Sequence, residues 1–273
     1  MSIRTPEKIT NVYGNKIRYL DYNSSNSKSE TLLLLHGIGA SAERWSEVIP
    51  FFYDHFRLIV PDIVGFGYSD KPTVEYNMSF FVKFLEEFLN KLGVKITSIG
   101  GSSFGGLIAA EYAIKYSNMV NKLVLVSPAG TMKTSTKTLE EYILASLYPT
   151  YDNVWRAFIN MAYDPKTVTE QTIEEFINRM KLPNSKYAFM STMLGIRNTT
   201  NLSSRLAKIL SPTMIIWGLQ DYMIPVKYAD DYKVIPNSNL EVIPECGHTP
   251  FTEKPQVFSK IAIDFLKGIN SIK

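Results

Sequence analysis

The chain has 273 residues, of which 45% are hydrophobic and 20% are charged, and its formal net charge is +3. This length suits one large α/β domain or a core with an inserted subdomain, and the composition argues against disorder. The charge is small and no long run of lysines or arginines is present, so we expect no nucleic-acid partner.

Cysteine usage and the N-terminal residues indicate the compartment. The single cysteine, Cys246, excludes an internal disulfide and fits a reducing environment. The N-terminal residues lack the apolar region of a signal peptide, and no apolar stretch approaches the length of a membrane span. We therefore expect a cytoplasmic protein without membrane insertion.

Short apolar segments alternate with amphipathic segments along most of the chain. Residues 17–22 are typical of an antiparallel edge strand. Near-continuous apolar runs then predict buried strands at residues 31–35, 57–60, 94–99, 122–126, 213–217 and 240–243. Helical spacing of apolar residues predicts helices at 78–92, 105–116 and 257–266. This alternation predicts a doubly wound α/β fold with a mostly parallel sheet.

The alternation breaks between residues 131 and 205, where prolines separate several short helical segments. We expect this segment to form a helical cap over the carboxyl edge of the sheet, where ligands of open α/β sheets bind. Residues 1–130 and 206–273 then form the core. Four large cap side chains are expected to contact the substrate: Tyr148, Trp155, Phe158 and Met193.

The stretch Gly101-Ser102-Ser103-Phe104-Gly105 fits the pattern G-x-S-x-G directly after a predicted strand. In this pattern a strained strand-to-helix turn exposes the central serine, and small neighbours let the helix approach the strand. The pattern cannot be centred on Ser102, because Phe104 stands where the second glycine would be required. Ser103 is therefore the candidate nucleophile.

A serine hydroxyl needs a neighbouring base, and the base needs an orienting group. His248 follows the last predicted strand in a loop, where an imidazole could reach the nucleophile. His36 ends a buried strand and is expected to hold the following loop, whereas His55 lies in a link between a helix and a strand. His248 is therefore the candidate base.

The candidate orienting acid is Asp221, which comes just after the predicted strand 213–217. A carboxylate there could accept the imidazole proton and stabilise the imidazolium. Glu245 is a weaker rival because it precedes His248 by only three residues on the same loop. The order Ser, Asp, His is expected for a nucleophile elbow on such a sheet, although Asp221 could also be a simple turn residue.

Attack on a carbonyl builds an oxyanion, which needs preorganised donors. We expect one donor to be the Phe104 N–H at a helix start, and the other to be the Ile38 N–H in the loop 36–41. That loop does not match a nucleotide-binding loop, because no third glycine follows in register. No paired set of His, Asp or Glu ligands is present in the sequence, so no metal is expected.

Five motifs in chain order resemble those of the α/β-hydrolase superfamily. They are Leu35-His36-Gly37, the segment 62–69, the stretch 101–105, the segment 218–221 and Gly247-His248. The resemblance covers nearly the whole chain outside the cap. It implies a mostly parallel eight-stranded sheet flanked by helices, with a helical cap inserted after the sixth strand. It also implies hydrolysis through an acyl-enzyme, no cofactor and a structural role for the Asp62 loop.

The resemblance leaves two kinds of enzyme and one kind of receptor. We expect an esterase that acts on small to medium apolar esters as its small-molecule substrates. The alternatives are a C–C bond hydrolase of ring-cleavage dienoates and a slow-turnover ligand receptor on the same fold. Related haloalkane dehalogenases and epoxide hydrolases carry aspartate at the nucleophile position, so Ser103 excludes both.

The choice between ester and C–C cleavage depends on three positions. The C–C hydrolases resemble one another in a cap arginine, an asparagine before the serine and a tryptophan after the histidine. Here Ser102 and Thr249 occupy the last two positions, and alignment places Phe176 at the first. Arg179, one helical turn further on, and Arg197 are other possible cations. A buried carboxylate without a cation is costly, so the sequence favours an ester substrate.

Overall fold

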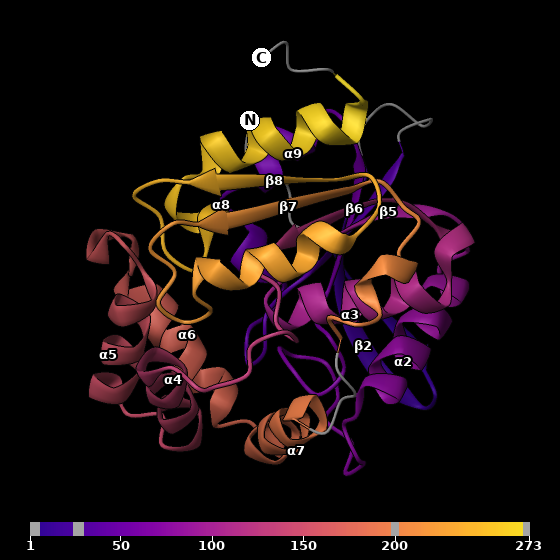
Figure 1. Ribbon diagram of the computed structural model, residues 1–273. Coiled ribbons are helices and arrows are strands. Elements are labelled where there is room, and N and C mark those ends of the chain that lie inside the picture. The colour runs from indigo at the N-terminus through magenta and orange to yellow at the C-terminus, as the bar shows by residue number, and fades with distance from the viewer. Residues whose placement is uncertain (1–5, 24–29, 198–201, 270–273) are drawn as a thin grey trace.

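The computed structural model describes residues 6–23, 30–197 and 202–269, which form one sheet with helices on both faces (Figure 1). The sheet has eight strands in the order β1-β2-β4-β3-β5-β6-β7-β8. These are β1 (Glu7–Val12), β2 (Asn15–Tyr22), β3 (Thr31–Leu35), β4 (Arg57–Pro61), β5 (Thr97–Ser102), β6 (Val120–Val126), β7 (Thr213–Gly218) and β8 (Ser238–Ile243). Strand β2 pairs antiparallel with β1 and β4, and the other neighbouring strands pair parallel. The predicted mostly parallel sheet is confirmed.

Each face of the sheet has its own core, because successive side chains of a strand point to opposite faces. Leu33 and Leu35 of β3 pack in the core that contains residues of α2 and α3, whereas Leu32 and Leu34 pack with residues of α1 and α9. The flanking helices are α1 (Ile49–Phe52), α2 (Met78–Lys91), α3 (Phe104–Lys115), α8 (Pro250–Glu253) and α9 (Pro255–Lys267). Burial on both faces explains why these strands are continuously apolar in the sequence.

The cap helices lie between β6 and β7, so the insertion follows the sixth strand as predicted. They are α4 (Lys137–Leu147), α5 (Tyr151–Met161), α6 (Glu170–Met180) and α7 (Ser185–Arg197). Threonines 136, 150 and 169 cap the first three of them, each accepting a hydrogen bond from a backbone N–H three residues later. Figure 1 shows α4, α5 and α6 grouped together, well separated from α9. The limits at residues 131 and 205 stay a prediction.

Short 3-10 segments connect several of these elements. They are η1 (Ala42–Trp45), η2 (Ser117–Met119), η3 (Pro165–Thr167), η4 (Leu206–Lys208) and η5 (Val226–Val234). Within the described ranges, no helix is both long enough and apolar enough to cross a membrane.

The predicted edge strand at residues 17–22 is corrected by the structure. This segment belongs to β2, which lies between β1 and β4, and β1 forms the edge. The two strands are joined at Tyr13 and Gly14, whose φ values are 51° and 82°. Of the residues in β1 only Val12 is fully buried, so the segment carries too little apolar alternation to be recognised as a strand.

The strand before Ser103 starts later than predicted. Strand β5 begins at Thr97 rather than at residue 94 and continues through Gly100 and Gly101, which pair with Leu34 and Leu35 of β3. Glycine is depleted in strands, so the sequence pattern ended the strand too early. The tertiary pairing extends it to the residue before the candidate nucleophile.

Candidate active site

Ser103 sits at the sharp turn between β5 and α3. Its φ and ψ values are 53° and −116°, a strained conformation for a residue with a side chain. A Cβ atom on Gly101 would lie 2.4 Å from the Gly105 carbonyl oxygen, and one on Gly105 would lie 2.3 Å from the Leu35 carbonyl oxygen. Glycine is therefore required at both positions for the helix to close on the strands, as the sequence pattern predicts.

Asp221 and His248 form a buried hydrogen-bonded pair. Asp221 Oδ2 lies 2.7 Å from His248 Nδ1, and both residues are only 3% exposed. The other carboxylate oxygen accepts hydrogen bonds from the N–H groups of Met223 and Ile224 at 2.9 and 2.8 Å. Because Asp221 Oδ2 can only accept a hydrogen bond, the proton of the neutral imidazole is assigned to His248 Nδ1. His248 Nε2 is then the basic nitrogen. Glu245, the rival acid, is instead 3.7 Å from Lys254 Nζ at the surface.

Ser103 and His248 line the same small cavity between core and cap, whose volume is about 50 Å³. The Ser103 hydroxyl forms no hydrogen bond with another described residue, although it lines the cavity together with His248. The apolar side chains that line the cavity are Ile38, Ala40, Phe158, Met161, Phe176, Met223 and Phe251. The polar side chains that line it, besides Ser103 and His248, are Arg44, Ser102, Tyr142, Arg179 and Thr249.

Both predicted oxyanion donors are available. Among the described residues, neither the Ile38 N–H nor the Phe104 N–H has a hydrogen-bond acceptor. Phe104 is the first residue of α3, where an N–H has no partner within the helix. A Cβ atom on Gly37 would lie 3.5 Å from the Ser103 Cβ atom, so the loop before Ile38 packs directly against the serine. The arrangement can present two N–H groups beside Ser103.

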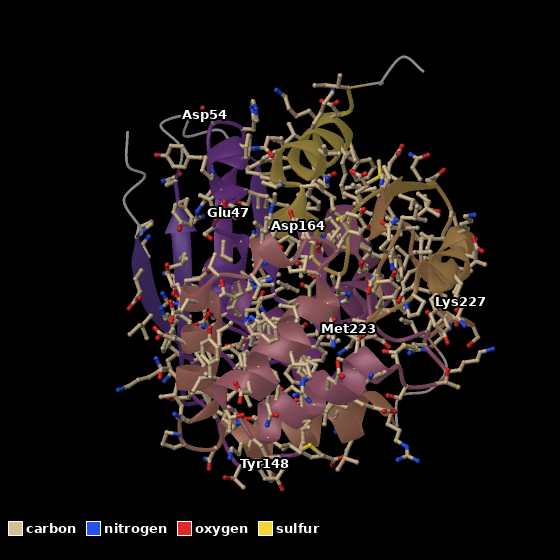
Figure 2. All side chains as sticks on the ribbon, turned by 90° about the vertical axis from the view of Figure 1, so that its left-hand side faces the viewer. Glu47, Asp54, Tyr148, Asp164, Met223 and Lys227 are labelled. Atoms are coloured by element: carbon tan, nitrogen blue, oxygen red, sulfur yellow. The ribbon has the colours of Figure 1, made fainter. Side chains whose placement is uncertain are left out.

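The structure corrects the predicted set of cap contacts. Phe158 lines the cavity, but Tyr148 and Trp155 are 64% and 45% exposed, and Met193 is half-buried outside the lining. Figure 2 shows Tyr148 at the edge of the molecule. Phe158 shares one face of α5 with buried Val154, and Trp155, one residue after Val154, points away from that face.

Glu253 is a residue that sequence analysis missed. Its carboxylate accepts hydrogen bonds from the N–H groups of Gly247 and Thr249 at 3.1 and 3.3 Å, and so holds both neighbours of His248. It also accepts from the Tyr163 N–H of the cap at 2.7 Å. No local motif marks a glutamate five residues after the histidine, so only the tertiary structure shows its position.

Two arginines line the cavity: Arg179, which the sequence offers as a possible cation, and Arg44, which sequence analysis missed. Arg179 is 4% exposed and lines the cavity together with Phe176, one helical turn earlier in α6. Arg44, in η1, lines it from the core. Arg197 is exposed at the end of α7 and lies outside the lining. The spacing of Arg179 from Phe176 was the available signal, since residues three apart share a helix face.

His36 and the Asp62 loop have structural contacts. His36 is buried, and its Nε2 atom accepts a hydrogen bond from the Ile63 N–H at 3.0 Å. Burial lowers the pKa of His36 and so favours its neutral form. Asp62 accepts from the N–H groups of Ala42 and Tyr68 at 2.7 and 2.8 Å. Both side chains therefore fix the loops around the site rather than enter the cavity.

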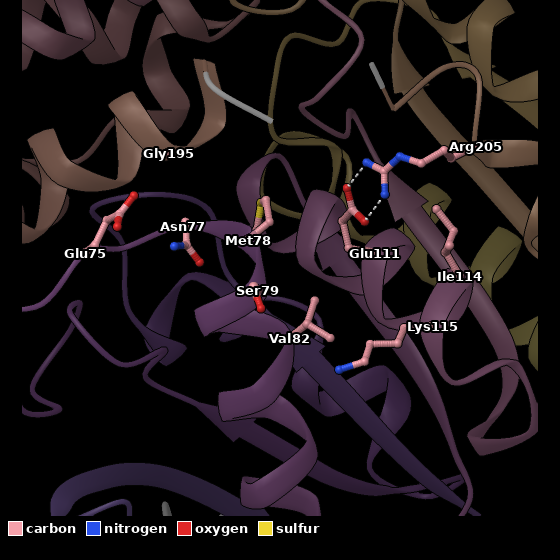
Figure 3. Close-up of a pocket in the computed structure, with 10 residues that line it drawn as sticks. All are labelled: Glu75, Asn77, Met78, Ser79, Val82, Glu111, Ile114, Lys115, Gly195 and Arg205. Carbon is pink, nitrogen blue, oxygen red and sulfur yellow. Dashed lines mark hydrogen bonds and ion pairs between the residues drawn. The ribbon is translucent and has the colours of Figure 1, made fainter. Parts of the chain in front are cut away.

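A larger cavity of about 590 Å³ lies elsewhere, between α2, α3 and the residues Gly195 and Arg205 (Figure 3). Figure 3 shows Glu111 and Arg205 joined by hydrogen bonds, of which the longer is 2.7 Å. This cavity lacks Ser103, His248 and Asp221, so its size does not make it the active site. Within the described ranges, no group of three or more His, Cys, Asp or Glu residues could hold a metal ion.

The known proteins to which this chain is similar include two hydrolases and one solved structure. The 2-hydroxy-6-oxo-6-(2'-aminophenyl)hexa-2,4-dienoic acid hydrolase of Metapseudomonas resinovorans is 29% identical over 278 aligned positions, covering 95% of this chain and 90% of the relative. A 2-hydroxy-6-oxononadienedioate/2-hydroxy-6-oxononatrienedioate hydrolase of a Pseudomonas species is 28% identical over 257 positions, covering 89% and 90%. The solved structure of a meta-cleavage product hydrolase from Pseudomonas fluorescens IP01 has a TM-score of 0.85 at 26% identity, covering 96% of this chain and 98% of that one.

The family model for the alpha/beta hydrolase fold matches residues 30–255, which is most of the chain. The match includes the turn at Ser103, the Asp221–His248 pair and the whole segment between them. With the strand order and the inserted cap described above, it establishes that this chain belongs to the α/β-hydrolase family.

Proposed function

We propose that the protein hydrolyses the C–C bond of a 2-hydroxy-6-oxo-dienoate, with Ser103 as nucleophile, His248 as base and Asp221 as orienting acid. The relatives named above, which are hydrolases of such dienoates, support this class of substrate. The observation that carries the proposal is the position of Arg179, whose buried guanidinium faces the same cavity as Ser103.

Arg179 removes the main objection to a dienoate. The sequence favours an ester because Phe176 stands where a cation for the substrate carboxylate is expected. In the structure Phe176 and Arg179 line the cavity together, so the cap supplies a cation one helical turn later. A carboxylate bound there would be paired, and its desolvation would be offset by a charge-assisted hydrogen bond.

The proposed chemistry uses the described groups in sequence. Ser103 Oγ attacks the 6-oxo carbon as His248 Nε2 takes its proton, and the Ile38 and Phe104 N–H groups stabilise the oxyanion. The substrate reacts as its 2-keto tautomer, in which the proton of the 2-hydroxyl has moved to C5. The C6 carbonyl re-forms as the C5–C6 bond breaks, and the released electron pair is delocalised from C5 to the 2-oxo oxygen as a dienolate. His248 returns its proton to this dienolate, which leaves as a 2-hydroxydienoate. Water then hydrolyses the acyl-enzyme by the same base.

Ester hydrolysis is the second candidate, because it needs the same nucleophile, base and oxyanion donors. The apolar wall formed by Phe158, Met161 and Met223 favours it. Ser102 and Thr249 also line the cavity at the two positions where the C–C hydrolases resemble one another in asparagine and tryptophan. These departures concern groups around the substrate and leave the proposed acyl transfer unchanged.

A panel of substrates tests the proposal. Purified protein would be assayed with 2-hydroxy-6-oxo-6-phenylhexa-2,4-dienoate and with 4-nitrophenyl esters of increasing acyl length, with Ser103→Ala as the blank. We expect the dienoate to give the highest kcat/KM. A higher kcat/KM for any ester would contradict the proposal and favour an esterase. Turnover far below about 1 per second with every substrate would favour a receptor.

A further inference from the structure

Arg44 is a cation of the cavity for which the proposed reaction has so far given no role. Its side chain lines the cavity from η1, directly after the loop that carries Ile38. Its hydrogen bond to Thr252 Oγ1 is long, at 3.4 Å, and it forms no ion pair with any residue that the structure describes. Burial lowers the pKa of Arg44, and the charge of Arg179 lowers it further. Arg44 is half-buried, so a carboxylate bound in the cavity could pair with its guanidinium.

Arg179 lines the same cavity from the cap helix α6. Its side chain is 5% exposed, its Nε atom has no partner, and its ion pair with Glu175 is 3.7 Å long. The side chain of Glu175 is 36% exposed, so water screens its attraction to the Arg179 guanidinium. The two guanidiniums therefore come from different parts of the fold, one from the core and one from the cap.

Tyr142 is close enough to both arginines for their charges to affect its pKa, but it does not provide a negative charge to pair with them. Burial raises the pKa of Tyr142 to about 12, although Arg179 and Arg44 each lower it. The hydroxyl is consequently neutral near pH 7, and it donates its proton to the Ile38 carbonyl. Glu253, the other acid near Arg44, accepts hydrogen bonds from the N–H groups of Gly247 in its own loop and of Tyr163 in the cap, and it forms no ion pair with Arg44.

The lining of the cavity favours a bound anion. Two guanidiniums line it, and no carboxylate among the described residues lines it with them. A substrate with one carboxylate could pair with both guanidiniums. It would also join the cap to the core through a pair of charge-assisted hydrogen bonds.

We propose that Arg44 and Arg179 together clamp one carboxylate of the substrate, which makes Arg44 a specificity-determining residue. The inference rests on the proposed function, since it deepens the choice of an acidic substrate for the same site. A neutral substrate would leave Arg44 without an anion and Arg179 with only its 3.7 Å ion pair to Glu175, so the clamp selects acids over their esters.

The test compares Arg44→Gln with wild type on 2-hydroxy-6-oxo-6-phenylhexa-2,4-dienoate and on its uncharged methyl ester. We expect kcat/KM for the acid to fall by about 10-fold to 100-fold more than for the methyl ester, mostly through KM, as for a lost hydrogen bond to a charged group. Arg44→Lys should lose less kcat/KM for the acid than Arg44→Gln, because lysine keeps the positive charge. It should still fall below wild type, because lysine lacks the planar guanidinium. Arg156→Gln, at an exposed arginine of α5, is the matched control and should leave the ratio unchanged.

A double variant tests whether both arginines bind the same carboxylate. The losses in Arg44→Gln and Arg179→Gln should not multiply in the double variant, because each changes the site of the other. The clamp would be overturned if the two losses were independent and if wild type preferred 2-hydroxy-6-oxononadienedioate, with that preference abolished in Arg44→Gln. Such a result would show two separate carboxylate sites. Equal losses for acid and methyl ester would also overturn it, since a merely structural role acts on both.

Failure of the proposed function can be recognised separately. If wild type cleaves no dienoate, the clamp is measured with mono-4-nitrophenyl succinate and glutarate against uncharged 4-nitrophenyl butyrate and pentanoate. A preference for the charged esters that disappears in Arg44→Gln would support the clamp in an esterase. The absence of any such preference would overturn the clamp as well.

Discussion

The hydroxyl of Tyr142 donates a 2.6 Å hydrogen bond to the carbonyl of Ile38, so a cap helix holds the loop of a proposed oxyanion donor. Both residues are buried. A Cβ atom on the neighbouring Gly39 would lie 3.1 Å from the same hydroxyl, which shows how closely the loop and the helix pack. The cap therefore contributes to the geometry of the proposed reaction centre as well as to the lining of the cavity.

Removing this hydroxyl should affect turnover more than substrate affinity. In Tyr142→Phe the Ile38 carbonyl loses its buried donor, and the loop can shift relative to Ser103. We expect kcat to fall by about 3-fold to 10-fold, as for the loss of one neutral hydrogen bond, with a smaller change in KM. Steady-state kinetics would check this against Tyr148→Phe, an exposed tyrosine of the cap. An unchanged kcat would contradict a role of Tyr142 in holding the loop.

The proposed nucleophile, base and acid should each be essential to the rate. Ser103→Ala, His248→Ala and Asp221→Asn are expected to lower kcat by on the order of 10⁴-fold while the fold is retained. Exposed counterparts provide controls, and His55→Ala and Glu245→Gln should keep nearly full activity. Loss of activity in Glu245→Gln with full activity in Asp221→Asn would reverse the assignment of the acid.

The buried His36 should make stability depend on pH. Because burial lowers the pKa of His36 in the folded protein, the unfolded chain binds a proton at a pH where the folded protein does not. The stabilising contribution is present above the unfolded pKa of about 6.5 and is lost as the pH falls below it. Denaturant titrations from about pH 7 to pH 5 should show a decline of at most about 1.4 kcal/mol per pH unit from this proton. The same slope in His36→Gln would assign the decline to other groups.

The glycine after the nucleophile turn should tolerate no side chain. A Cβ atom on Gly105 would lie 2.3 Å from the Leu35 carbonyl oxygen, and backbone atoms cannot give way as a flexible side chain can. Gly105→Ala should lower the free energy of unfolding by about 3 kcal/mol or more. Gly93→Ala is the control, since its Cβ would meet no atom within 4 Å and only the positive φ of 68° would cost about 1–2 kcal/mol. Thermal and denaturant unfolding would compare the two variants.

Much of the fold was accessible from local sequence patterns. Continuous apolar runs identify strands that are buried on both faces, and helical spacing identifies α2, α3 and α9 within one or two residues of their ends. The patterns failed where a strand is exposed, as in β1, and where glycines continue a strand, as in β5. In both places pairing with a neighbouring strand, rather than the segment's own side chains, decides the structure.

The sequence by itself determined the candidate nucleophile, base and acid, because each belongs to a motif tied to a strand end. Strand ends in a parallel sheet meet at one edge, so Ser103, Asp221 and His248 could be expected together before any coordinates. Their roles remain predictions until the variants are measured.

Only the tertiary structure decided which other side chains surround Ser103. Trp155 and Phe158 have similar chemistry, yet helix packing turns one to solvent and the other to the cavity. Arg44 and Arg179 are far apart in the chain and belong to no motif, so their common cavity depends on how the cap rests on the core. A motif specifies local backbone geometry, whereas the direction of a cap side chain depends on contacts that no short segment encodes.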